Sequence, residues 1–285
     1  MDQERSDENP AARWLRARVS RGHLLAAAGA GIASALVPGA VGAASGPPVL
    51  SFPFFPPITS GSYTTEGIQE IFNAVVTVHY LAATGATMTL DNAAALGYTG
   101  WQLSMQQAAA GRAQYHIDFL TSLGGTPVTT AFTFPPGVFR NRPLALSTGE
   151  GAASILVGTQ MTAAREFAEL GQPTLAKWMY QMGTQVAEQR VLVRTLQAID
   201  GVATAVPPNN KAFATDLFLY TRDVIGVLRG LGLIGGRAPA VSYPGRDAVL
   251  AAVGPMATAI LQKRPNDASS TITITGPASV TGERP

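Results

Sequence analysis

Few residues in this sequence could do chemistry, because it contains no cysteine and only three histidines. Disulfides, thiol nucleophiles and cysteine-ligated metal clusters are therefore excluded. His23 lies in the N-terminal segment, where it is expected to be a spacer. His79 and His116 remain, and each lies in a stretch with helical periodicity. If the two helices are antiparallel neighbours, both imidazoles face the interior between them.

Two interpretations of this histidine pair remain open. With Gln189 or Glu188 nearby, His79 and His116 would form a reduced site for a single transition-metal ion such as zinc or copper. Alternatively, they are core histidines whose hydrogen bonds are satisfied within an interior rich in Ala and Val. The second interpretation is favoured, because no carboxylate is expected beside the pair to complete a metal site; no Glu-x-x-His occurs in the chain. No cofactor is expected unless the single-ion alternative holds.

The charge balance limits the classes of partner. Lys and Arg number 20 against 18 Asp and Glu, and only 13% of the residues are charged, about half the usual share. No long basic run exists to neutralise phosphates, so a nucleic-acid partner is excluded. The sequence also has no Gly-rich phosphate loop and no G-x-S-x-G nucleophile motif.

The N-terminal residues 1–43 have the features of an export signal. A polar segment with several arginines precedes the uncharged stretch Leu24–Val41, and small residues around Ala43 suit signal-peptidase cleavage. Ser20–Leu25 resembles a twin-arginine signal in which Gly22 replaces the second arginine. We therefore expect export to the periplasm, cell envelope or extracellular space. No stable membrane span is expected unless the leader stays uncleaved.

Apolar periodicity beyond the leader predicts five helical stretches. Their expected ranges are Thr65 to about Ala86, Thr99–Leu123, Ser147–Leu170, Thr174–Ile199 and Ala212–Leu233. The third helix is expected to open with the capping box Ser147–Glu150, in which the Ser147 hydroxyl is at the cap position and the Glu150 carboxylate, three residues later, completes the cap.

The linking segments complete the predicted architecture. Residues 126–143 read as a long crossing connection between the second and third helices. Two long helices, a long link and two more long helices are typical of a four-helix bundle with one crossover, an all-α fold. A short helix is expected near Asp247–Val253, and Thr271–Thr275 alternates like a strand.

These elements suggest a domain organisation in five parts. Residues 1–43 are the export signal and 44–63 a Pro/Phe-rich extended arm. The four-helix bundle spans 64–203, an accessory helical segment spans 204–264, and 265–285 form an extended or strand-like tail.

Three segments resemble a known family. Gln114–Gly124 resembles the second-helix signature of secreted ferritin-like proteins, the group that includes desiccation-related ferritin-like domains. Ala164–Pro173 and Ala187–Arg194 are similar to that group's third-to-fourth helix region. The resemblance covers about residues 64–235 and implies a ferritin-like bundle with an extra C-terminal helix.

The resemblance also implies that the family's di-metal site is degenerate. The six ligand positions fall at His79, Ala113, His116, Ala153, Val186 and Gln189. Only His116 keeps the family's residue, and the family's tyrosine falls at Gln160. All four carboxylates are missing, so two dications in a low-dielectric core would be uncompensated. The resemblance therefore implies that the remnant of the metal site consists of His79, His116 and Gln189.

The remaining glutamates are expected to have no role in a site. Glu66, Glu70, Glu166 and Glu169 have spacings that suit solvated helix faces.

Three functional hypotheses follow. The first is an exported, non-catalytic structural or interaction module of the cell envelope, which binds a protein partner or itself through the 44–63 arm and the 270–276 tail. The alternative is a metal-binding or oxidative-stress protein that uses His79 and His116. The third is a protein that holds a small apolar ligand between the bundle and residues 212–235.

Overall fold

The computed structural model describes residues 64–201, 214 and 217–265, and this part of the chain is mostly helical. The four long helices are α4 (Ile68–Asp91), α5 (Gly100–Ser122), α6 (Arg142–Glu169) and α7 (Pro173–Ile199). The shorter elements are β1 (Ala131–Thr133), α8 (Asp223–Gly230), β2 (Ala240–Ser242), α9 (Arg246–Val253) and α10 (Met256–Ala259).

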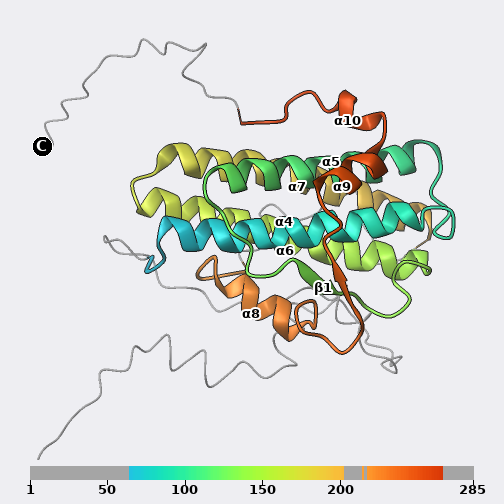
Figure 1. Ribbon diagram of the computed structural model, residues 1–285, viewed down its shortest axis with the longest axis horizontal. Coiled ribbons are helices and arrows are strands. Elements are labelled where there is room, and N and C mark those ends of the chain that lie inside the picture. The colour runs from blue at the N-terminus through green and yellow to red at the C-terminus, as the bar shows by residue number, and fades with distance from the viewer. Residues whose placement is uncertain (1–63, 202–213, 215–216, 266–285) are drawn as a thin grey trace, which may run out of the picture.

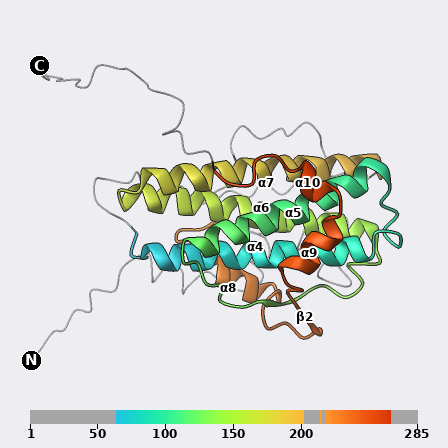
Figure 2. The same cartoon turned by 45° about the horizontal axis from the view of Figure 1, so that its top comes forward.

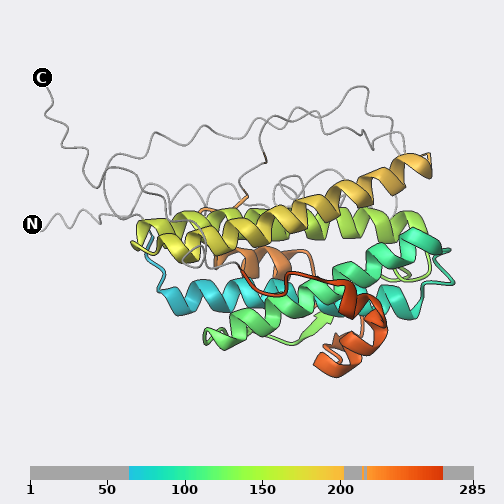
Figure 3. The same cartoon turned by 90° about the horizontal axis from the view of Figure 1, so that it is seen from above.

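The four long helices lie side by side in two layers. Figure 3 shows α4 and α5 in one layer and α6 and α7 in the other. The connection from α5 to α6 crosses the length of the bundle, so that α6 runs in the same direction as α5 (Figure 1). The all-α class predicted from the sequence is therefore confirmed, and the link at 126–143 does cross the bundle.

Helix α4 is the most apolar of the four and lies at the centre of the packing. Ile71, Val75 and Val78 are fully buried and pack against side chains of the neighbouring helices. By length and composition α4 could cross a membrane, but 67% of its most apolar 18-residue window is buried inside the protein. Its hydrophobicity is accounted for by these contacts between helices.

The start of α6 differs from the prediction. The helix begins at Arg142, five residues before the expected capping box, because Asn141 Oδ1 accepts a hydrogen bond from Leu144 N at 3.0 Å. Glu150 therefore lies inside the helix and is not a cap. Its carboxylate pairs with Arg194 at 3.6 Å and Arg190 at 3.7 Å, which joins α6 to α7.

The predicted helix over Ala212–Leu233 is largely wrong. Within its described part, only Asp223–Gly230 is helical, as α8. Residues 218–222 instead follow a path set by hydrogen bonds to α6, and Gly232, with φ +71°, ends the helical run. α8 lies along α4 and α6, and its buried face belongs to the same core cluster as both (Figures 1 and 2).

The crossover pairs with the segment between α8 and α9 in a short sheet that the sequence does not predict. β1 pairs antiparallel with β2, with Phe132 opposite Val241. Asn73 Oδ1 accepts a hydrogen bond from Thr126 N at 2.8 Å, which ties the start of the crossover to α4. The short helix expected near Asp247–Val253 is present as α9, which packs against α4 and α5.

Several expectations concern residues outside the described part of the chain. These are the leader at 1–43, the arm at 44–63 and the strand at Thr271–Thr275 within the tail. They stay predictions.

The corrected start of α6 can be tested by removing its cap. We expect Asn141→Ala to lower the free energy of unfolding by about 1 kcal/mol, because Leu144 N loses its acceptor. Ser147→Ala is the matched control, since the Ser147 hydroxyl only donates to Leu144 O within the helix, and it should change stability by less than about 0.5 kcal/mol. Urea unfolding of both variants measures this; a larger loss for Ser147→Ala would restore the original helix start.

Candidate functional site

The two histidines meet at the centre of the bundle. His79 lies on α4 and His116 on α5, and their ring centroids are 4.6 Å apart with an edge-to-face angle of 77°. His79 has no exposed surface and His116 is partly exposed. The helix periodicity used in the sequence analysis thus places both rings in the interior, as expected.

Hydrogen bonding satisfies the pair only in part. Gln160, on α6, brings its amide nitrogen to 3.0 Å from His79 Nε2. Nδ1 of His79 and Nδ1 of His116 are buried without a hydrogen-bond partner among the described residues, as is Gln160 Oε1. The expectation of satisfied core histidines therefore holds for one nitrogen of His79 and fails for the two Nδ1 atoms.

The third member of the predicted metal site has a different partner. Gln189 Oε1 accepts a hydrogen bond from Arg112 Nη2 at 3.3 Å, and no hydrogen bond joins it to either histidine among the described residues. Arg112 was missed by the sequence analysis, although a signal was present. It precedes His116 by four residues, and residues spaced i, i+4 share a helix face.

The environment keeps both imidazoles neutral at pH 7. Burial lowers the pKa of His79 to about 3, assisted by the positive charge of Arg112. Burial also holds the pKa of His116 well below its usual value, with His79 and Arg112 adding to the effect. Burial lowers the pKa of Arg112 to about 10, so its guanidinium stays charged. The cluster is two neutral rings beside one cation.

This donor set does not fit a pair of bound dications. Ala113, Ala153 and Val186, three positions where the family resemblance implies ligands, are buried apolar side chains. Within the described residues no group of three or more His, Cys, Asp or Glu side chains is placed to hold a metal ion. The charge at the centre comes from Arg112, which repels cations.

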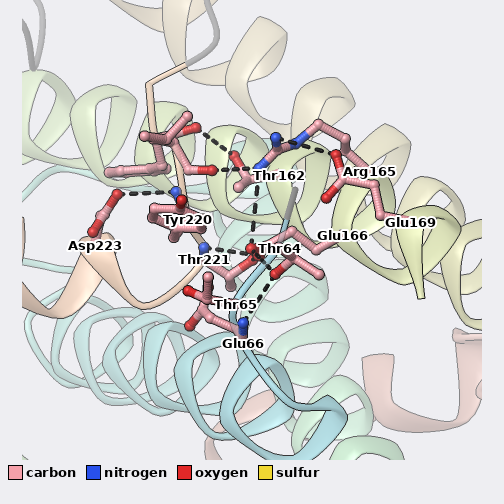
Figure 4. Close-up of polar contacts among 12 residues, drawn as sticks. Thr64, Thr65, Glu66, Thr162, Arg165, Glu166, Glu169, Tyr220, Thr221 and Asp223 are labelled. Atoms are coloured by element: carbon pink, nitrogen blue, oxygen red, sulfur yellow. Dashed lines mark hydrogen bonds and ion pairs between the residues drawn. The ribbon is translucent and has the colours of Figure 1, made fainter. Parts of the chain in front are cut away.

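A second polar cluster lies at one end of the bundle and contradicts an expectation. Glu66 and Glu166, expected on solvated faces, are 2% and 0% exposed. Figure 4 shows them between the segment before α4, helix α6 and the segment before α8. We call these two side chains the glutamate pair.

Glu166 accepts hydrogen bonds from both neighbouring segments. Its Oε1 accepts from Thr64 Oγ1 at 2.6 Å. Its Oε2 accepts from the backbone N–H of Thr221 at 2.9 Å and from the Thr221 hydroxyl (Figure 4). Three donors thus compensate the lost hydration of this carboxylate.

Glu66 has fewer donors and is the protonated partner at moderate pH. Its two oxygens lie 3.0 and 3.2 Å from the backbone nitrogen of Arg222. Burial, followed by the charge of Glu166, raises the pKa of Glu66 to about 7, and a hydrogen bond between the two side chains adds to the rise. Below that pH Glu66 donates its proton toward Glu166.

Neighbouring residues of α6 hold the same segment. Thr162 Oγ1 donates to Phe218 O at 3.2 Å, and Arg165 donates to Leu219 O. Residues 218–221 are therefore fixed along α6 by three polar side chains of one helix face, Thr162, Arg165 and Glu166. A sequence signal existed for Glu166, because it is in phase with the buried residues Ala163 and Phe167.

Comparisons of the chain with models of protein families, with curated proteins and with solved structures find no match in any of the three.

The glutamate pair predicts a specific pH dependence. Because the pKa of Glu66 is raised on folding, the folded chain holds this proton more tightly, and the pair's contribution to stability falls as pH rises from about 4.5 to about 7. Glu66→Gln keeps a donor toward Glu166 and cannot ionise. At pH 8 we expect it to be about 1–2 kcal/mol more stable than the parent, with little difference at pH 5.

The matched control is Glu166→Gln. Its amide N–H₂ would face at least one of the three donors from Thr64 and Thr221, so we expect the free energy of unfolding to fall by about 1–3 kcal/mol at both pH values. Urea unfolding at pH 5 and pH 8 measures both variants. The lowered pKa values of His79 and His116 make their contribution to stability rise with pH, which is the opposite of the effect of Glu66. Parent and variants share this contribution, so it cancels when their free energies of unfolding are compared. Equal stability differences for Glu66→Gln at the two pH values would contradict the assignment.

Proposed function

We propose that the chain is an exported ferritin-like bundle that has lost its di-metal ligands and acts as a non-catalytic structural or interaction module of the cell envelope. The observation that carries the proposal is the charge at the bundle centre. The guanidinium of Arg112 lies close enough to His79 and His116 to lower the pKa of both. A site for two dications needs several negative charges at this position.

The chain order of the helices supports the ferritin-like part of the proposal. Two antiparallel pairs joined by a crossover along the bundle, with α5 and α6 running in the same direction, have the connectivity of bundles with one long crossover. The three sequence segments that resemble secreted ferritin-like proteins lie on α5, α6 and α7 and in the α6–α7 turn.

The non-catalytic part rests on the lack of a poised proton donor or acceptor in the central cluster. Both imidazoles have pKa values far below neutrality, whereas a general base works best with a pKa near the operating pH. Glu66 has a pKa of about 7, but its hydrogen bonds hold backbone segments together. The envelope location rests on the leader and on the arm and tail expected from the sequence.

One observation favours the alternative of a single-ion site. The Nδ1 atoms of His79 and His116 are buried without partners among the described residues, and their rings are in contact. Two imidazoles can ligate zinc or copper. Arg112 opposes this, since an added ion would lie close to a buried positive charge.

Elemental analysis separates the two functions. We expect the full chain, purified from cells grown with added iron and zinc, to hold less than about 0.1 equivalents of either metal. Two tightly held metals per chain would overturn the proposal. One metal per chain that disappears in both His79→Ala and His116→Ala, with the helical circular dichroism unchanged, would establish the alternative instead.

A further inference from the structure

A cavity lies beside the central cluster, between the two layers of helices. Its volume is about 170 Å³, and its lining comes from α4, α5, α6, α7, the crossover and the residues just after α8. Small side chains leave the space open. Ala109, Gly149 and Ala153 line it from α5 and α6, and a Cβ added at Gly149 would meet no atom within 4 Å.

The lining is apolar over most of its extent. Leucine, valine, phenylalanine and alanine side chains predominate, including Leu231 and Leu233 from the segment that follows α8. An engineered apolar cavity of about 150 Å³ is known to stay dry and to bind benzene. A cavity of the present size therefore has room for an apolar body of roughly six to ten carbon atoms.

One lining side chain is charged. Arg112 borders the cavity, and among the described residues its guanidinium forms no ion pair with a carboxylate. Its hydrogen bond to Gln189 uses one of five N–H donors. Glu188, the acidic residue that raises its pKa, is exposed, so the compensation is partial. A partly buried guanidinium that lacks a paired anion among the described residues favours an anionic guest.

From this juxtaposition of an apolar cavity and an unpaired guanidinium, we propose that the bundle binds a small amphiphilic monocarboxylate, a medium-chain fatty acid, with its carboxylate on Arg112 and its chain in the cavity. The binding site is independent of the ferritin-like assignment and of any partner in the envelope. It differs from the purely apolar ligand considered from the sequence, because the head group is specified.

Calorimetric titration of the full chain with octanoate tests the site, with octanol and octylamine as ligands of equal chain length. We expect octanoate to bind at least about tenfold more tightly than octanol, and octylamine most weakly, since a hydrogen bond to a charged group is worth that factor or more. Shortening the chain to hexanoate should weaken binding about fourfold per methylene removed.

Two variants locate the ligand, each with a matched control. Arg112→Gln should weaken octanoate binding at least about tenfold and leave octanol unchanged, whereas Arg229→Gln, on an exposed position of α8, should change neither. Ala109→Leu should fill the cavity and abolish binding of both ligands. Ala108→Leu, the adjacent residue outside the cavity lining, should leave binding as in the parent.

A measurement on the unmodified chain covers the case in which Arg112→Gln does not fold. The ¹³C carboxyl resonance of labelled octanoate should titrate at lower pH when bound than when free, because Arg112 stabilises the anion. Titration as in water, equal affinity for octanol, or octanoate binding that survives Ala109→Leu would each overturn the proposal. So would the absence of binding at millimolar octanoate.

Discussion

A charged group enclosed by a helical bundle has to recover the hydration that it loses, and the described part of this chain is organised around two solutions to that problem. At the centre, a guanidinium borders a cavity and hydrogen-bonds one amide, and the neighbouring imidazoles stay neutral. At one end, Glu166 collects three donors and Glu66 keeps a proton. The carboxylates at the end of the bundle also have Arg165 within 4.0 Å of Glu166, whereas Arg112 at the centre has no carboxylate partner among the described residues.

The glutamate pair explains why the chain after α7 returns to the bundle where it does. Two backbone N–H groups, those of Thr221 and Arg222, point at carboxylate oxygens supplied by α6 and by the segment before α4. These bonds are long-range in sequence, and they position the start of α8. The buried face of α8, with Val224 and Leu228, can then join the core formed by α4 and α6. Polar contacts fix the position, and apolar burial supplies most of the free energy.

Helix periodicity predicts much of this fold, and it fails where a tertiary contact decides the local structure. The four long helices are anticipated to within a few residues at most ends, because each has a long apolar stripe and terminators such as Gly124–Gly125. The start of α6 is missed because the sequence offers two possible N-caps, Asn141 and the capping box at Ser147–Glu150, and local sequence does not distinguish them. The length of α8 is missed because the residues before it bond to α6 rather than to each other. Spacing alone could not show these partners, since they lie more than fifty residues away.

The central cluster shows the same limit in its chemistry. Spacing correctly places His79 and His116 on inward faces of their helices. It also predicts Gln189 as their neighbour, whereas Gln189 accepts a hydrogen bond from Arg112. Glu66 and Glu166 are the two most buried acidic side chains among the described residues, although their residue type favours exposure. For Glu166 the helical phase with Ala163 and Phe167 indicates burial, whereas Glu66 lies before α4, where no phase applies. The phase is the better guide when donors from a distant segment can supply the compensation that the helix itself lacks.

The loss of ligands and the presence of the cavity have a common origin on the proposed ferritin-like assignment. Of the positions that the family resemblance marks as ligands, Ala113, Ala153, Val186 and Gln189 all line the cavity. Replacing carboxylates and a histidine with shorter or neutral side chains removes negative charge and frees volume at the same place. Among the described residues Arg112 has no carboxylate partner, and it borders a cavity of about 170 Å³. On that assignment, the loss of the cation site would leave the two features that the proposed organic anion requires, a guanidinium and an apolar cavity.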